Sequence, residues 1–258
     1  FPRQKEGTVM ESAEPAGGRI ELRDGFSDRL EPTTPLDLAR VTSVAELVQA
    51  MSQTAFGGRT VGEAADVLYE MVTHPECLVV GTFSGAMTVA KMGLVLCDMI
   101  EQGMLQAVIA TGALMAHGFV EASGRVHFKY DPAMDDTALY ERGYNRVYDT
   151  LELEQNLDDV AEIFSEVLAN VDPAETLCSY KINHLLGAYL ARHSPGRGIL
   201  KSAYEHNVPV YVPAFTDSEI GLDFALTNRR RRLAGKPTLA YDPFLDLEHY
   251  TDLVRPQQ

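Results

Sequence analysis

The sequence predicts an α/β protein in which helices flank a parallel sheet. Short, fully apolar segments recur along the chain, as expected of strands buried on both faces. Segments with helical periodicity lie between them. Small and polar residues follow three of the apolar segments, at the strand ends where open α/β sheets bind their ligands. This alternation is typical of a parallel sheet that carries a binding site at one edge.

The first 36 residues are polar and rich in Gly, Pro and Glu, which favours a poorly ordered N-terminal arm (1–36) before a single domain (37–258). The first predicted helix lies in "TSVAELVQAM" (42–51), where Ser43 and Glu46 form a capping box. A second helix is predicted in "VGEAADVLYEMV" (61–72).

The strands and helices that follow alternate. The predicted strands are 77–82, 105–111, 208–213 and a weaker fourth at 237–242. The predicted helices are 88–103, ending at Gly103, then 157–170, 175–193 and 198–207. Three loops that follow predicted strands are therefore candidate parts of a ligand-binding site: "GTFSGAMT", "ATGALMAHG" and "PAFTDSEIGLD". No GxGxxG dinucleotide fingerprint is present.

Composition restricts the function classes. The net charge of −15 argues against non-specific nucleic-acid binding and is compatible with a cationic ligand. We find no apolar run of bilayer length and no signal-peptide pattern, and we expect a cytoplasmic protein without a membrane partner. The three cysteines have no metal-type spacing and fit reduced, buried thiols. The basic run 229–232 fits a solvated face or an inter-subunit contact, with an anion site as the alternative.

Three separated blocks carry a family resemblance. The first is "GTFSGAMT…ATGALMAHGF", the second "LYERGYNRVYDTLEL" (139–153), and the third "HNVPVYVPAFTDSEIGLD". In order and spacing they resemble deoxyhypusine synthase and its bacterial deoxyhypusine synthase-like and homospermidine synthase-like relatives, over roughly residues 60–255. The resemblance implies a Rossmann-like fold and a homotetramer built as a dimer of dimers.

The resemblance also implies a reaction. Enzymes of this family use NAD to oxidise spermidine and pass its aminobutyl group to a lysine or to putrescine. By position in the matching motifs, the residues expected at NAD are Ser84, Gly85, Thr88, Thr111, Gly112, Ala113 and Asp217. Purely structural roles remain open for three of them: Ser84 and Thr88 as the start and cap of the following helix, and Asp217 as an Asx-turn residue.

The amine site departs from the family pattern. His117 and Ala116 occupy positions where deoxyhypusine synthase has glutamates, and Leu222 occupies the position of a polyamine-binding aspartate. We therefore expect Glu219 and Asp223, with His117, to contact the substrate. His117 is also the candidate base, although a structural histidine is an equal alternative.

The family's imine-forming lysine has no match among Lys181, Lys201 and Lys236. Three explanations stay open: a C-terminal segment has been removed or is disordered, a second chain supplies it, or the protein is a non-catalytic paralogue. The chain alone is expected not to transfer an aminobutyl group.

Two further functions are retained as alternatives. One is a regulatory subunit that pairs with a homologue. The other is an agmatine or guanidine hydrolase on the same scaffold, although the sequence contains no paired metal-ligand motif and predicts no metal site.

Overall fold

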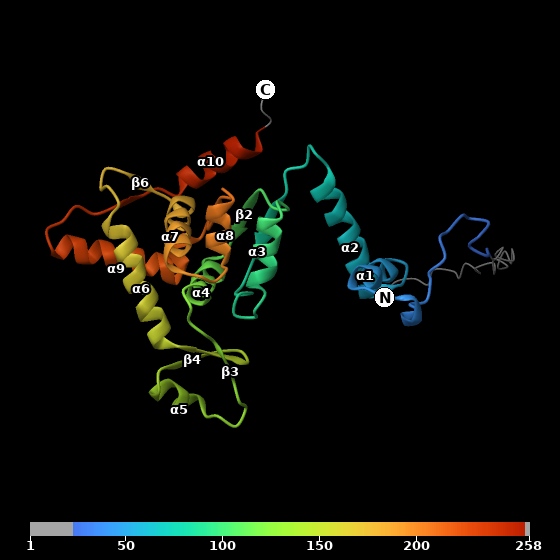
Figure 1. The fold of residues 1–258 in the computed structure, drawn as a ribbon, viewed down its shortest axis with the longest axis horizontal. Coiled ribbons are helices and arrows are strands. Elements are labelled where there is room, and N and C mark those ends of the chain that lie inside the picture. The colour runs from blue at the N-terminus through green and yellow to red at the C-terminus, as the bar shows by residue number, and fades with distance from the viewer. Residues whose placement is uncertain (1–22, 256–258) are drawn as a thin grey trace, which may run out of the picture. The chain divides into compact units, whose positions relative to one another are not determined.

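A computed structural model of the chain describes residues 23–255, and the chain divides into two compact units, residues 1–67 and 68–258 (Figure 1). Residues 1–22 of the predicted arm lie outside the described residues. The prediction of a single domain that begins at residue 37 stays a prediction.

The described part of the first unit is helical. It contains the short 3₁₀ helix η1 (Leu38–Arg40), α1 (Val44–Ser52) and the start of α2 (Phe56–Thr73), which continues into the second unit. The N-cap half of the predicted capping box is confirmed, because the Glu46 amide donates to Ser43 Oγ at 3.2 Å; the Glu46 carboxylate accepts from the amide of Thr42, one residue before the N-cap, at 2.6 Å.

A three-stranded parallel sheet lies at the centre of the second unit. Its strands are β1 (Val80–Phe83), β2 (Ala107–Ala110) and β7 (Val210–Tyr211), in the spatial order β1-β2-β7. The register pairs Val80 with Ala107 and Val108 with Val210. The predicted strands at 77–82, 105–111 and 208–213 are therefore confirmed, as is the parallel α/β class.

Helices surround this sheet (Figure 1). They are α3 (Gly93–Glu101), α4 (Gly112–Ala122), α6 (Glu154–Ala169), α7 (Ser179–His193), α8 (Ile199–Glu205), α9 (Glu219–Leu233) and α10 (Phe244–Val254). The apolar faces of these helices other than α10 form one core with β2 and β7, which includes Ile100, Leu114, Phe119, Phe164, Ile182, Leu186, Val108 and Val210. None of the helices within residues 23–255 has the length and apolar character needed to cross a bilayer.

The helix predicted at 88–103 begins later than expected. It starts at Gly93, after Met92 as N-cap, and no side chain caps it, so the capping role considered for Ser84 and Thr88 is wrong. Thr88 is 1% exposed and its hydroxyl donates to the Leu114 carbonyl at 3.1 Å. This bond holds the loop before α3 against α4, and α3 therefore begins only at Gly93.

The fourth predicted strand does not join the main sheet. Residues of 237–242 form β8 (Ala240–Tyr241), which pairs in parallel with β6 (Thr176–Leu177) in a separate two-stranded sheet. β6 also occupies the start of the helix predicted at 175–193, so α7 begins only at Ser179. The reason is Asp246 on α10, whose buried carboxylate accepts the amides of Ser179 and Tyr180 at 3.1 and 2.9 Å.

A second segment projects between α4 and α6. Here β3 (Phe128–Lys129), β5 (Thr150–Leu153) and β4 (Tyr144–Val147) form an antiparallel sheet in the order β3-β5-β4, with α5 (Asp136–Glu141) in the connection. We had predicted no strands in this segment. Its sheet brings residue 127 opposite residue 152, because Phe128 pairs with Leu151.

We predict that Asp246→Ala lowers the free energy of unfolding by about 2–4 kcal/mol, because it leaves two amides at the α7 N-terminus without their buried acceptor. Urea denaturation followed by circular dichroism measures this. Asp252→Ala, at an exposed position of the same helix, is the control and should change stability by less than about 0.5 kcal/mol. Equal effects of the two substitutions would contradict the prediction.

Candidate functional site

The loops after β1 and β2 are joined side by side at the carboxyl edge of the main sheet. Thr111 Oγ1 donates to the Gly85 carbonyl at 2.8 Å, and the Thr111 amide donates to the Phe83 carbonyl at 3.2 Å. Gly85 has a φ of +70°, which a residue with a side chain rarely adopts. These two loops therefore form one surface at the edge where ligands of parallel sheets collect.

The start of α9 meets the start of α4 at the same edge. A Cβ atom on Gly112 would lie 2.0 Å from the Cβ of Ser218, so only glycine permits this contact. Ser218 caps α9 by accepting the Gly221 amide at 3.1 Å and donates to the Phe215 carbonyl at 2.7 Å. Two helix N-termini, both favourable for anions, thus converge here.

Asp217 lies in this turn, at the end of the 3₁₀ helix η2 (Phe215–Asp217), and is exposed. Within residues 23–255 its carboxylate accepts no hydrogen bond, so the Asx-turn alternative has no support. Ser84 is exposed on the loop after β1, and Ala113 is half-buried in the first turn of α4. Thr88 differs from the other predicted cofactor residues, because it lies in the interior beneath the loop.

Two carboxylates follow on the first turns of α9. Burial raises the pKa of Asp223 to about 6, and the nearby Glu219 contributes in the same direction. Burial also raises the pKa of Glu219, an effect that His117 partly offsets. Leu222, in register with the family's polyamine-binding aspartate, is 57% exposed. Glu219 is exposed and Asp223 is half-buried, and two carboxylates one helical turn apart favour a ligand with ammonium groups.

His117 faces two residues that we had not predicted. Its Nδ1 lies 2.9 Å from Glu152 Oε2, and His127 Nε2 lies 3.3 Å from Glu152 Oε1. Burial raises the pKa of Glu152, but the two imidazoles outweigh it and bring this pKa to about 2. Burial lowers the pKa of His117, but Glu152 outweighs this effect and the pKa lies above its ordinary value. His117 is therefore part of a buried cluster rather than an isolated histidine.

The local sequence around Glu152 and His127, which were not predicted as site residues, indicates their role only weakly. Glu152 stands in "TLEL", a strand-like segment in which a charged residue follows a leucine that is buried. His127 immediately precedes β3. Only the antiparallel register of β3 and β5 brings His127 close to Glu152, and no local sequence pattern predicts that register.

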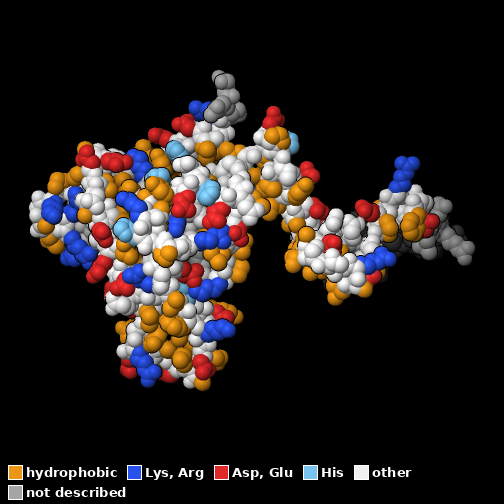
Figure 2. All heavy atoms as spheres, in the orientation of Figure 1, with side chains coloured by type: hydrophobic (Ala, Val, Ile, Leu, Met, Phe, Trp, Pro, Cys, Tyr) orange, Lys and Arg blue, Asp and Glu red, His pale blue; other side chains and the backbone are white. Residues whose placement is uncertain are grey.

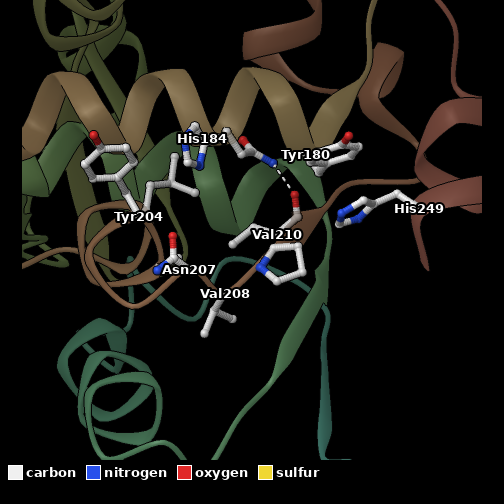
Figure 3. Close-up of a pocket in the computed structure, with 11 residues that line it drawn as sticks. Tyr180, His184, Tyr204, Asn207, Val208, Val210 and His249 are labelled. Carbon is white, nitrogen blue, oxygen red and sulfur yellow. Dashed lines mark hydrogen bonds between the residues drawn. The ribbon is translucent and has the colours of Figure 1, made fainter. Parts of the chain in front are cut away.

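A separate cavity of about 190 Å³ lies at the opposite end of β7 (Figure 3). Figure 3 shows His184, Tyr204 and Asn207 around it, with Tyr180 and His249 at its side. Asn183 donates to the Val210 carbonyl at 2.9 Å in its wall. Because Val208 precedes β7, this cavity adjoins the amino end of the strand and none of the predicted site residues lines it.

Comparison with known proteins agrees with the motifs at the carboxyl edge. Residues 46–258 match the model of the deoxyhypusine synthase family. The chain belongs to this family. The resemblance found in the sequence is thus confirmed.

Curated members of the deoxyhypusine synthase family are clearly similar. The chain is 34% identical over 227 residues to "Probable deoxyhypusine synthase 2" of Methanosarcina mazei, a match that covers 86% of this chain and 63% of the relative. A "Deoxyhypusine synthase-like protein" of Coxiella burnetii is 29% identical over 183 residues, covering 70% of this chain and 52% of the relative. The chain therefore spans about half to two thirds of the length of these relatives.

A solved structure supports the fold alone. A protein of Entamoeba histolytica proposed to be a deoxyhypusine synthase superposes with a TM-score of 0.60 at 14% identity, covering 85% of this chain and 73% of the other. The chain therefore shares its α/β fold with this structure.

We predict that Asp223→Asn stabilises the protein in a pH-dependent way. The pKa of about 6 in the folded state exceeds the ordinary 3.8, so the stability linked to this group is present below about pH 4 and is lost as the pH rises through 6. Asp223→Asn removes the ionisable carboxyl group, so the variant does not lose this stability as the pH rises. Thermal denaturation should show it about 1–2 kcal/mol more stable than the native protein at pH 8, with little difference at pH 4.

The control for this comparison is Asp252→Asn, at an exposed position of α10. Its stability relative to the native protein should not change between pH 4 and pH 8. A loss of stability at pH 8 in Asp223→Asn would show instead that the native carboxylate has a favourable charged partner.

Proposed function

We propose that this chain forms the NAD-binding and polyamine-binding part of a deoxyhypusine synthase-like aminobutyl transferase, with spermidine as donor and a lysine side chain or putrescine as acceptor. Family membership supports the reaction class. The observation that carries the proposal is the convergence of the β1 loop, the β2 loop and the η2–α9 turn at one edge of the sheet.

The residues at this edge fit a dinucleotide. Gly85 has open space where a side chain would stand, and the Asp217 carboxylate is free to accept ribose hydroxyls. Ser84, Thr111, Gly112 and Ala113 would complete the contacts at the α4 N-terminus, with Thr88 supporting the loop from the interior. When bound, NAD supplies the hydride acceptor for oxidation of the amine carbon.

Glu219 and Asp223 would hold the ammonium groups of the polyamine. The pKa values of both carboxylates are raised, and a bound ammonium group would favour their ionised form. His117 lies within electrostatic range of Glu219 and would border the same ligand. The chain's own part in catalysis is therefore to bind and orient the amine beside the cofactor.

The imine-forming lysine remains to be supplied. Lys181 donates to Glu175 and to the Thr176 carbonyl, and Lys201 donates to the carbonyls of Ser194 and Gly196. Both ammonium groups are thus committed to structural contacts. We propose that a second chain supplies the lysine.

A homo-oligomer, with a tetramer as the expected form, would bring a second chain to the site. Apolar side chains gather over the projecting β3–α5–β4 segment at the bottom of the larger unit (Figure 2). Tyr140 and Tyr148 are among the most exposed apolar residues of this segment, at 79% and 87%. Such a surface supports subunit association, and we propose the cytoplasm as the location.

A second candidate function is hydrolysis of an amidine or guanidine such as agmatine. His117 favours it, because this histidine stands at a position where deoxyhypusine synthase has a glutamate and contacts Glu152, which also contacts His127. Formation of urea from agmatine by the purified protein would distinguish it from aminobutyl transfer.

We predict that NAD at about 100 times its Kd raises the Tm of the purified protein by roughly 5–10 °C, and that Asp217→Ala weakens NAD binding about tenfold or more. Differential scanning fluorimetry and calorimetric titration measure the two effects. Asp252→Ala, at an exposed position remote in sequence, should bind NAD like the native protein.

The same samples are then incubated with NAD and spermidine, with and without putrescine, and analysed by mass spectrometry for homospermidine. Absence of any stabilisation by millimolar NAD would contradict the proposed function.

A further inference from the structure

We propose that His117, His127 and Glu152 form a binding site for a divalent first-row transition metal, with Zn²⁺ as the ion to test. The ligand atoms of the three residues all lie within 4.8 Å of one another. Two imidazole nitrogens and one carboxylate are a donor set that zinc accepts in proteins. This proposal does not depend on the transferase function.

The geometry within the cluster suits a shared cation better than pairwise hydrogen bonds. His117 Nδ1 is 2.9 Å and His127 Nε2 is 3.3 Å from the Glu152 carboxylate. Yet neither nitrogen, nor Glu152 Oε1, makes an aligned hydrogen bond within residues 23–255. Short contacts without alignment are expected when the donor atoms point to a common centre instead of to one another.

Burial strengthens this argument. The side chains of His127 and Glu152 are 0% and 2% exposed. With both imidazoles neutral, the cluster carries one negative charge that water does not solvate, and a buried charge without a partner is unfavourable. A bound cation neutralises the carboxylate and satisfies all three unpartnered atoms at once.

A second carboxylate supports the required tautomer of His127. Glu121 Oε1 lies 3.4 Å from His127 Nδ1, on the opposite side of the ring from Glu152. Lys91 Nζ also lies 3.1 Å from this Nδ1 and bonds to Glu121; because an ammonium group can only donate, the Nδ1–H tautomer requires that Lys91 donate to Glu121 alone. When Nδ1–H faces Glu121, the lone pair of Nε2 faces the cluster, as in the carboxylate–histidine–metal arrangement of many zinc sites.

The three ligands come from rigid elements that the fold brings together. His117 lies on α4, Glu152 on the central strand of the β3-β5-β4 sheet, and His127 next to β3. His117 is the accessible member, with a side chain 15% exposed. A fourth coordination position would therefore open on the His117 side, toward the region of Glu219, and accept water or a neutral nitrogen of a ligand.

The test uses the whole chain, dialysed against a chelator and then titrated with Zn²⁺ by calorimetry and with Co²⁺ by visible absorption. We expect one metal ion per chain with a Kd below about 1 µM. Each of His117→Ala, His127→Ala and Glu152→Gln should weaken binding at least about 100-fold, and Glu121→Gln about 10-fold. Glu152→Gln keeps the shape of the side chain, and circular dichroism checks that each variant is folded.

The matched control is the double variant His74→Ala with Cys77→Ser, which removes a histidine and a cysteine from a separate turn. It should bind zinc like the native protein. Less than about 0.2 metal ions per chain, or equal affinity in Glu152→Gln, would overturn the proposal and leave the cluster as a proton-sharing set. NAD and polyamine binding, measured on the chelator-treated protein, tests the proposed function separately.

Discussion

The contact between Gly112 and Ser218 is the constraint on which the candidate site depends. It joins the N-terminus of α4, which follows β2, to the N-terminus of α9, which follows β7. A Cβ atom on Gly112 would lie only 2.0 Å from the Ser218 side chain, so the two helices can approach this closely only because residue 112 is glycine. Asp217 and Glu219 flank Ser218, so one close contact places a predicted cofactor residue and a predicted amine residue together.

Much of the scaffold could be predicted because its signals are local. Apolar segments gave the three strands of the main sheet, and helical periodicity gave α6 to α8 within a few residues. The helices α4, α9 and α10 were not predicted, and the errors in the fourth strand and at the start of α7 came from long-range contacts. The strand at 240–241 pairs with residues 176–177, and the Asp246 carboxylate sets the start of α7 from 67 positions away. No local sequence pattern predicts the pairing of β6 with β8 or the contact of Asp246 with α7.

Some residues of the candidate site could be predicted from local sequence, and others depend on contacts between distant parts of the chain. Thr111, Gly112 and Asp217 follow strands, and a rule about strand ends finds them. The buried position of Thr88 depends on a bond to Leu114, and the cluster around His117 depends on the pairing of β3 with β5. Three side chains that come from a helix, a loop and a strand become neighbours only after the tertiary structure forms.

The register of β3 and β5 has a consequence for how this protein can vary. Because side chains alternate between the two faces of a strand, a shift of one residue in this pairing would turn Glu152 away from both histidines. The exposed connection from Asp131 to Met134 lies outside the three strands and can gain or lose residues without changing the pairing of β3 or β4 with β5. Insertions should therefore be tolerated inside the projecting segment and rejected at its base, which makes the connection a suitable place to graft a reporter sequence.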